Sequence, residues 1–338
     1  MNKKVTVLTD ADLIYYYTNF LVEDAFLLLV DNSINLFVDA RYYEAVKNNK
    51  NFTSRLINSQ NQIYDFLKSL NAKKIGLVYD YTSAKLYDEL LKLGYELYDA
   101  SNEVFLKTSV KAESELLLIE RACKIAEASF NKILPMLKEG VTESEVQCEL
   151  EHQFRLNGAE DKAFNSIVAF GEGSSVPHYK TGNAVLKKDM PVLFDFGCKY
   201  QGYLSDLTRS FYFGTPTKKY IEAFNSVYNA QRLAISLIKS GITGKEADSI
   251  ARNYLKQFGF DKYFIHSLGH GVGVKIHEEP RLSIKSGQIL QENNVFSVEP
   301  GIYFEGEFGI RIEDTCIIKN GVCRPLTLNK IECVLNKK

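Results

Sequence analysis

Residues 191–213 read PVLFDFGCKYQGYLSDLTRSFYF, two apolar, strand-forming runs that each carry one acidic residue. Asp195 lies in the first run and Asp206 in the second, with turn residues at Tyr200–Gly202 between them. Pairing of these strands would bring both carboxylates to one face, where like charges require a cation. The competing interpretations are an edge-strand Asp195 that faces solvent and an Arg209 that neutralises Asp206.

A second acidic stretch is found at residues 295–318, VFSVEPGIYFEGEFGIRIEDTCII. Glu299 precedes a Pro-Gly pair in an apolar strand, and Glu313 lies two positions after Arg311, so strand alternation points those two to one side. A salt bridge between Arg311 and Glu313 would explain that pair without a metal ion. Four acidic residues, each in an apolar strand, nevertheless favour one shared site over four separate explanations.

Histidine is scarce in this chain, and three of its five histidines fall within residues 266–280, HSLGHGVGVKIHEEP. Glycines on both sides of His270 let the backbone approach a crowded site closely. A lone core histidine is more often a hydrogen-bonded filler, but His266, His270 and His277 together indicate a cleft. His178, in VPHYKTG, would be a surface residue if taken alone. The glycine-rich stretches lack the phosphate-binding GxGxxG and Walker patterns.

One imidazole plus four carboxylates is a ligand set suited to two borderline divalent cations, and such a pair activates water. The sequence therefore predicts metal-dependent hydrolysis. This donor set favours Mn2+ or Co2+, and Zn2+ or Fe2+ are compatible with it.

Bulk properties exclude several other classes of protein. At 338 residues the chain is long enough for two domains. Its net charge of −1 does not favour a nucleic-acid partner. The N-terminus does not read as a signal peptide, and apolar runs such as AFLLLV at 25–30 are too short to span a membrane. Six cysteines without CxxC spacing indicate reduced thiols, so a cytoplasmic location is expected.

The pattern of expected helices and strands changes near residue 108. Residues 1–108 alternate short strands and helices, contain no histidine and predict a small α/β domain. Asp31-Asn32-Ser33, between the apolar runs 25–30 and 34–38, predicts a hairpin. From residue 109 onward, each half gives helices followed by an acidic two-strand unit, which indicates a duplicated architecture. Expected helices cover 111–140, with Pro135 as a kink or late-turn feature, 142–156 behind a Thr142 capping box, 220–240, and 244–258 capped near Thr243. Expected strands cover 164–170, 192–199, 204–213, 264–268, 272–276, 295–303 and 309–318.

These motifs resemble those of the pita-bread-fold metallopeptidases, the family of methionine aminopeptidases, Xaa-Pro aminopeptidases and Xaa-Pro dipeptidases. The resemblance covers essentially the whole chain. It implies a fold of the α/β (α+β) class with a creatinase/prolidase-like N-terminal domain at residues 1–108. The pita-bread catalytic domain would occupy residues 109–338, with a pseudo-twofold central antiparallel sheet flanked by helices.

The resemblance also implies roles for individual residues. Five would be metal ligands, with Asp206 and Glu313 bridging two ions: Asp195, Asp206, His270, Glu299 and Glu313. Three residues would act in catalysis. Glu299 would move the proton of the water, and His178 and His277 would hydrogen-bond the developing oxyanion or hold the substrate. Three residues would bind substrate: His266, Arg281 and Arg311. Of these, Arg281 could equally be a solvent-facing turn arginine.

The N-terminal segments TNF, LFVDARYYEAV and KIGLVYD, together with PHY at 177–179 and SVEPGIY at 297–303, resemble the proline-specific branch. The expected activity is therefore hydrolysis of the bond between an N-terminal residue and proline, as in an Xaa-Pro aminopeptidase. An Xaa-Pro dipeptidase is the first alternative, and a non-catalytic peptide- or protein-binding member of the fold is the second. The resemblance implies two divalent metal ions, Xaa-Pro peptides as substrates and a homodimer, with no nucleic acid or membrane partner.

Overall fold

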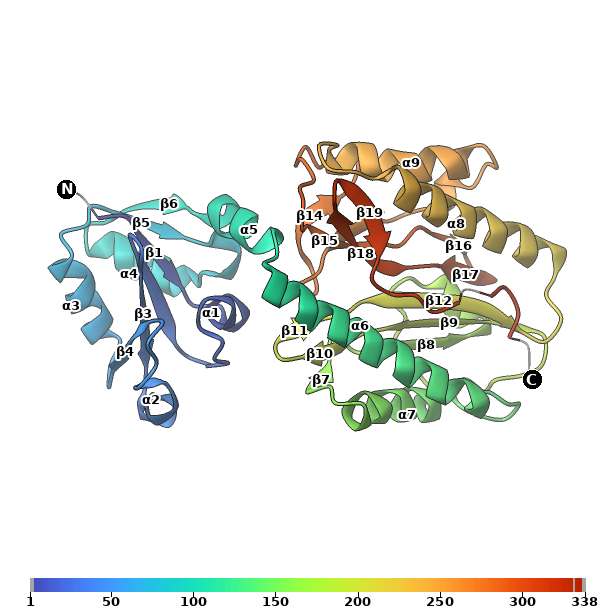
Figure 1. Cartoon of the computed structure of the whole chain (residues 1–338). Helices are drawn as coiled ribbons and strands as arrows, with labels where there is room; N and C mark the ends of the chain where they lie inside the picture. Colours follow the sequence, from blue (N-terminus) through green and yellow to red (C-terminus); the bar gives the residue numbers. More distant parts are fainter. Residues whose placement is uncertain (1–2, 331, 336–338) are drawn as a thin grey trace. The chain divides into compact units, whose positions relative to one another are not determined.

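The structure, a computed structural model, describes residues 3–330 and 332–335. The chain divides into two units, one ending at Thr108 and the other beginning at Ser109 (Figure 1). Each unit encloses hydrophobic cores of its own. Among the described residues, no helix combines the length and apolar character needed to cross a membrane.

The first unit is built on a six-stranded sheet in the order β4-β3-β2-β1-β5-β6. The predicted hairpin at Asp31 is confirmed, because Val30 pairs with Ser33 across the turn. Its strands are β1 Val5–Leu8, β2 Phe26–Val30, β3 Ser33–Val38, β4 Thr53–Leu56, β5 Lys74–Leu77 and β6 Glu96–Asp99. Its helices are α1 Ala11–Thr18, α2 Ala40–Val46, α3 Asn61–Ser69, α4 Ala84–Lys92 and α5 Ser101–Ser109, the last of which ends in the second unit.

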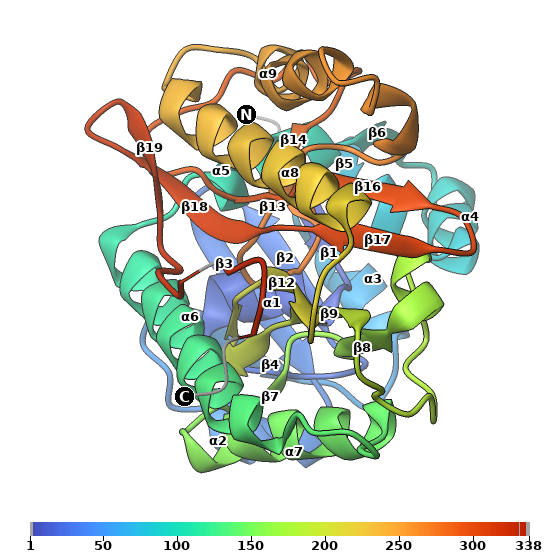
Figure 2. The ribbon, with the colours of Figure 1, turned by 90° about the vertical axis from the view of Figure 1, so that its right-hand side faces the viewer.

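Two pairs of helices frame the second unit. α6 (Glu113–Ile133) packs against α7 (Glu143–Leu156), and α8 (Lys218–Leu237) packs against α9 (Gly244–Lys256). Figure 2 shows the two pairs on opposite sides of the strands. The capping boxes expected at Thr142 and Thr243 are confirmed. Pro135 lies in a short 3-10 turn, Leu134–Met136, directly after α6.

Every strand pair of the second unit that the structure describes is antiparallel. The sheets have the orders β12-β9-β8, β14-β13-β15-β18-β19, β11-β10-β7 and β16-β17. The strands of the first half are β7 Asp161–Lys162, β8 Ile167–Phe170, β9 Met190–Phe196, β10 Cys198–Tyr200, β11 Tyr203–Leu204 and β12 Leu207–Phe213. Those of the second half are β13 Gly269–Gly271, β14 Glu278–Leu282, β15 Val295–Val298, β16 Gly301–Phe304, β17 Phe308–Arg311, β18 Asp314–Lys319 and β19 Val322–Pro325.

The strands expected at 264–268 and 272–276 are wrong. In the first range the backbone bonds to side chains of α9, since Arg252 donates to the carbonyls of Phe264 and His266, and Asp248 accepts from Leu268 N–H. The second range is a loop, and the strand lies between the two ranges, at β13. The strands expected at 295–303 and 309–318 are each interrupted, by Glu299-Pro300 and by Ile312-Glu313. Proline has no N–H to continue a ladder, which explains the first break.

Candidate metal centre

The two aspartates lie where β9 and β12 pair. Asp195 is opposite Thr208 in the register, and Asp206 lies just before β12, where its backbone N–H donates to Thr315 Oγ1 at 3.1 Å. Arg209 does not neutralise Asp206; it forms an ion pair with Asp314 at 2.8 Å. That observation removes the competing interpretation of Asp206, which is buried.

The two glutamates lie in the two strand breaks, where the backbone leaves the ladder. Glu299 N–H donates to Leu268 O at 2.8 Å, and the Glu313 carboxylate accepts from Thr208 Oγ1 at 2.6 Å. Arg311 forms its ion pair with Asp195, at 2.6 Å, rather than with Glu313. The simple Arg311–Glu313 bridge is therefore not what orders these acids.

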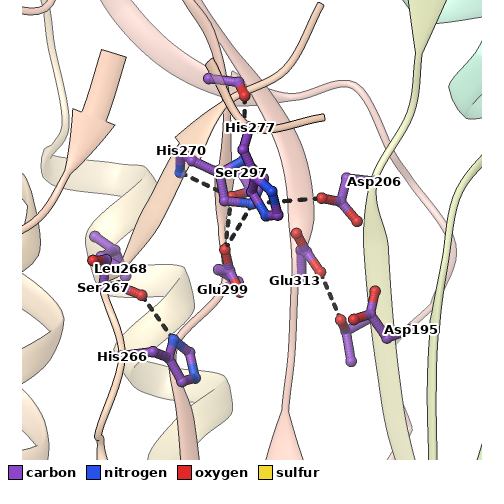
Figure 3. A network of polar contacts seen from close by, with 12 residues as sticks. Asp195, Asp206, His266, Ser267, Leu268, His270, His277, Ser297, Glu299 and Glu313 are labelled. Atoms are coloured by element: carbon purple, nitrogen blue, oxygen red, sulfur yellow. Dashed lines mark hydrogen bonds and ion pairs between the residues drawn. The ribbon is translucent and has the colours of Figure 1, made fainter. Parts of the chain in front are cut away.

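His270 is the middle residue of the short strand β13, between Gly269 and Gly271. Its Nε2 lies 3.2 Å from Glu299 Oε1 and 3.6 Å from Asp206 Oδ2 (Figure 3). Its Nδ1 lies 3.2 Å from its neighbour's carbonyl, Gly271 O, which directs Nε2 at the acids. Gly269 is required here, because a Cβ at that position would lie 1.9 Å from Ser297 O. Close backbone approach thus brings His270 to the acids.

The five predicted ligands all line one cavity of about 500 Å³. One ligand atom from each of Asp206, His270 and Glu313 lies within 4.8 Å of the other two. Burial and neighbouring carboxylates raise the pKa values of Asp206 and Glu313 well above their usual range. Asp195 Oδ1 is buried and has no hydrogen-bond partner among the described residues. Like charges buried together and an orphaned oxygen are what a cation site requires, so these residues fit divalent metal ions.

Glu299 differs from the other acids in its electrostatics. Burial alone would raise its pKa, but the hydrogen bond with His270 and the charges of His270, His266 and Arg311 lower the pKa of Glu299 to about 2. The carboxylate is therefore ionised at neutral pH. An ionised carboxylate beside the cation site can accept a proton.

Tyr303, which the sequence reasoning missed, links two of the predicted substrate residues. Its hydroxyl lies 2.9 Å from His266 Nε2 and accepts from Arg311 Nη1 at 2.6 Å. Arg311 also donates to Asp195, to Thr208 and to a backbone carbonyl. His266 and Arg311 line the cavity, but their nitrogens are engaged within the protein. The signal that could have identified Tyr303 is its position on the strand directly after Glu299.

His178, His277 and Arg281 line the same cavity and are exposed. The His277 ring contacts the His270 ring edge-on, with centroids 4.3 Å apart. Partial burial, together with the nearby His270 and Arg281, lowers the pKa of His277 to about 4, so its ring is neutral at pH 7. Arg281 Nη2 lies 3.5 Å from the backbone carbonyl of His277. The predicted catalytic histidines therefore face the same space as the acids.

A buried carboxylate that the sequence did not reveal holds the loop that carries His178. Glu143, at the start of α7, accepts from Phe170 N–H at 2.7 Å and from Gly182 N–H and Tyr179 Oη at 3.0 Å each. Its only sequence signal was its place beside the capping box at Thr142. The three bonds fix both ends of the segment around His178.

Comparisons with known proteins agree with this geometry. Residues 118–320 match the model of metallopeptidase family M24, and residues 4–105 match the creatinase/prolidase N-terminal domain. The Xaa-Pro dipeptidase of Pyrococcus horikoshii is 34% identical over 310 residues, 91% of this chain and 88% of the relative. The solved X-Pro aminopeptidase from Thermotoga maritima has a TM-score of 0.89 and 32% identity, covering 98% of this chain and 97% of that one. The prolidase from Pyrococcus furiosus has a TM-score of 0.91 and 32% identity, covering 97% of each chain.

Proposed function

This chain belongs to metallopeptidase family M24, and from that premise we propose that it hydrolyses the peptide bond between an N-terminal residue and proline. The pita-bread fold expected from the resemblance is confirmed by the solved structures that the chain matches. One observation carries the proposal: four carboxylates and one imidazole, from strands far apart in sequence, line a single cavity. Membership of the family implies divalent metal ions as cofactors.

Five residues would hold two of these ions: Asp195, Asp206, His270, Glu299 and Glu313. The close approach of Asp206, His270 and Glu313 supports this assignment. A bound pair of cations would lower the pKa of a shared water towards neutrality. Carboxylate oxygens with one imidazole favour Mn2+ or Co2+, and Zn2+ or Fe2+ are compatible.

The remaining groups would bind the peptide and move its proton. Glu299, ionised at neutral pH, accepts the proton of the attacking water. His277, neutral at pH 7, and His178 hydrogen-bond the carbonyl oxygen of the residue before proline. The apolar side chains of Phe164 and Ile276 line the same cavity and offer a surface to the pyrrolidine ring. Proline has no N–H to donate, so such a surface selects it better than a hydrogen-bond acceptor would.

A second candidate, an Xaa-Pro dipeptidase, is favoured by Arg281. This exposed guanidinium lines the cavity beside His277 and can bind the free carboxylate of a C-terminal proline. The relative from Pyrococcus horikoshii carries that name. The two candidates share the site and differ only in whether the substrate continues beyond proline.

Cleavage of Ala-Pro and of Ala-Pro-Ala by the purified protein, loaded in turn with Mn2+, Co2+ and Zn2+, tests the proposal. Release of alanine from Ala-Pro-Ala supports the aminopeptidase, and cleavage of Ala-Pro alone supports the dipeptidase. For the dipeptidase, Arg281→Met should raise KM for Ala-Pro about tenfold or more, because a charge-assisted bond is lost. Full metal loading without cleavage of either peptide would contradict the proposal and favour the non-catalytic binding alternative.

The predicted homodimer and cytoplasmic location stay predictions. Light scattering of the purified protein tests the first. The expectation of reduced thiols is consistent with the described residues, in which all six cysteines are free.

A further inference from the structure

We propose that Lys111 and Glu278 are positioning residues, a buried ion pair that holds His277 in place against the metal-site histidine His270. The proposal rests on the proposed function, because it assigns His277 a role in binding the peptide. Neither residue lines the cavity, and neither was singled out by the sequence motifs.

The two side chains form a contact that is sealed from solvent. Lys111 Nζ donates to Glu278 Oε1, and the side chains are 1% and 5% exposed. A buried ion pair is seldom the most stable way to fill space, since apolar side chains of similar volume often do as well. This buried ion pair therefore points to a role other than stabilising the fold. The residues around the pair indicate what that role is.

Glu278 is placed to organise the loop that joins His270 to His277. It comes directly after His277 and lies opposite Gly271 in the β13–β14 register. Its Oε2 accepts from Lys275 N–H at 3.3 Å, inside the loop. A Cβ on Gly273 would lie 2.4 Å from Glu278 Oε1, so the carboxylate fills the inner side of the turn. The loop backbone at Gly273 and Lys275 thus lies against this one carboxylate.

Lys111 ties that carboxylate to the rest of the sheet. Its backbone N–H donates to Asn293 O at 3.0 Å, and Asn294 Nδ2 donates to Ser109 O at 2.9 Å. These asparagines lead directly into β15, which pairs with β13 through Phe296 and Gly271. The strand that carries His270 and the side chain that anchors His277 are therefore braced against the same element.

The consequence is a fixed distance between the two histidines. Their ring centroids lie 4.3 Å apart in an edge-on arrangement, and the two residues are beside one another in Figure 3. His277 is exposed, and its backbone belongs to the loop that Glu278 contacts. A displacement of about 1 Å in a group that orients substrate can cost a hundredfold in rate. The ion pair acts on the reaction through His277, and touches no substrate itself.

Glu278→Gln tests the proposal, because it keeps the shape and removes the charge. We expect kcat on the cleaved Xaa-Pro peptide to fall about tenfold or more, with KM changed less than about twofold and metal content unchanged. In an His277→Ala background the same substitution should have no further effect, since the residue being positioned is gone. Glu307→Gln, which removes an exposed acid from its ion pair with Lys219 in the turn between β16 and β17, is the matched control and should leave kcat unchanged.

A second readout does not depend on activity. In nitrogen-detected NMR of the imidazoles, Glu278→Gln should shift the His277 ring signals and leave those of His152, on α7, unmoved. Unshifted His277 signals would overturn the proposal. So would a fall in kcat on Glu278→Gln that is as large in the His277→Ala background as in the wild type. If Glu278→Gln does not fold, Lys111→Met/Glu278→Gln leaves no unpaired buried charge and takes its place. A wild-type protein that cleaves no Xaa-Pro peptide would refute the proposed function, while the imidazole signals would still decide whether the pair positions His277.

Discussion

At the scale of single residues, three acids of the cavity each accept a hydrogen bond from a different neighbouring side chain. Thr208 donates to Glu313, Ser297 donates to Glu299, and Arg311 donates to Asp195. Arg311 contacts Asp195 Oδ2, while Asp195 Oδ1 is buried and has no hydrogen-bond partner among the described residues. The charge that remains there is what a cation would neutralise.

Metal binding should therefore release protons. The pKa values of Asp206 and Glu313 are raised in the metal-free protein, so these acids hold protons at a pH where free carboxylates are ionised. A cation must displace them, so its apparent affinity should rise with pH until both acids are ionised. Calorimetric titration with Mn2+ in buffers of different ionisation enthalpy measures this, and Glu313→Gln should reduce the number of protons released. Heats that do not depend on the buffer would contradict the prediction.

Arg311→Lys should weaken metal binding although it keeps the charge. Arg311 makes four hydrogen bonds, to Tyr303, Asp195, Thr208 and a backbone carbonyl, which a lysine ammonium cannot reproduce in one plane. Loss of a group that orients a ligand typically costs about 10- to 100-fold in metal affinity. Tyr303→Phe removes only one of these bonds and should have a smaller effect. Equal metal affinity in Arg311→Lys and wild type would refute this role.

At the scale of elements, helix starts and strand breaks present the functional groups. Glu143 begins α7, and Glu299 and Glu313 lie where strands are interrupted. Within a regular ladder, the backbone N–H and C=O groups of a residue are hydrogen-bonded to the adjacent strands. At a break or a helix start the backbone turns, and the side chain can reach a distant loop.

Glu143→Gln should destabilise the loop that carries His178. One carboxylate oxygen would become an amide that donates, facing N–H or O–H groups that also donate. A buried donor left without an acceptor costs about 1–3 kcal/mol, measurable by urea unfolding. Glu145→Gln, two residues further along α7, is the control, because glutamine also completes a capping box. Equal stability of the two variants would contradict the prediction.

At the scale of the whole molecule, the candidate metal group that the described residues contain lies in the second unit. A ligand stabilises the folded unit that binds it, by about 2.7 kcal/mol at a hundredfold excess over Kd. Removing metal with a chelator should therefore lower the calorimetric transition of the second unit. The transition of the first unit, which has its own cores, should stay in place. An equal shift of both transitions would rule this out.

Much of the fold could be predicted from local signals. The hairpin at Asp31 and the helix starts behind Thr142 and Thr243 result from short-range chemistry, and the structure has them where expected. The strand expected at 264–268 failed, because Arg252 and Asp248 on α9 take the backbone bonds that a ladder would use. No periodicity within the segment reveals that competition, which arises only when α9 packs against it.

The same division holds for the candidate site. Local sequence is enough to identify the unusual side chains, because acids in apolar strands and clustered histidines are visible within short segments. The pairing of each acid with its donor follows from tertiary packing: Arg209 with Asp314, Arg311 with Asp195, and Lys111 with Glu278. These partners lie roughly a hundred or more residues apart along the chain. Their pairing depends on how whole strands and helices pack, and no short-range rule encodes it.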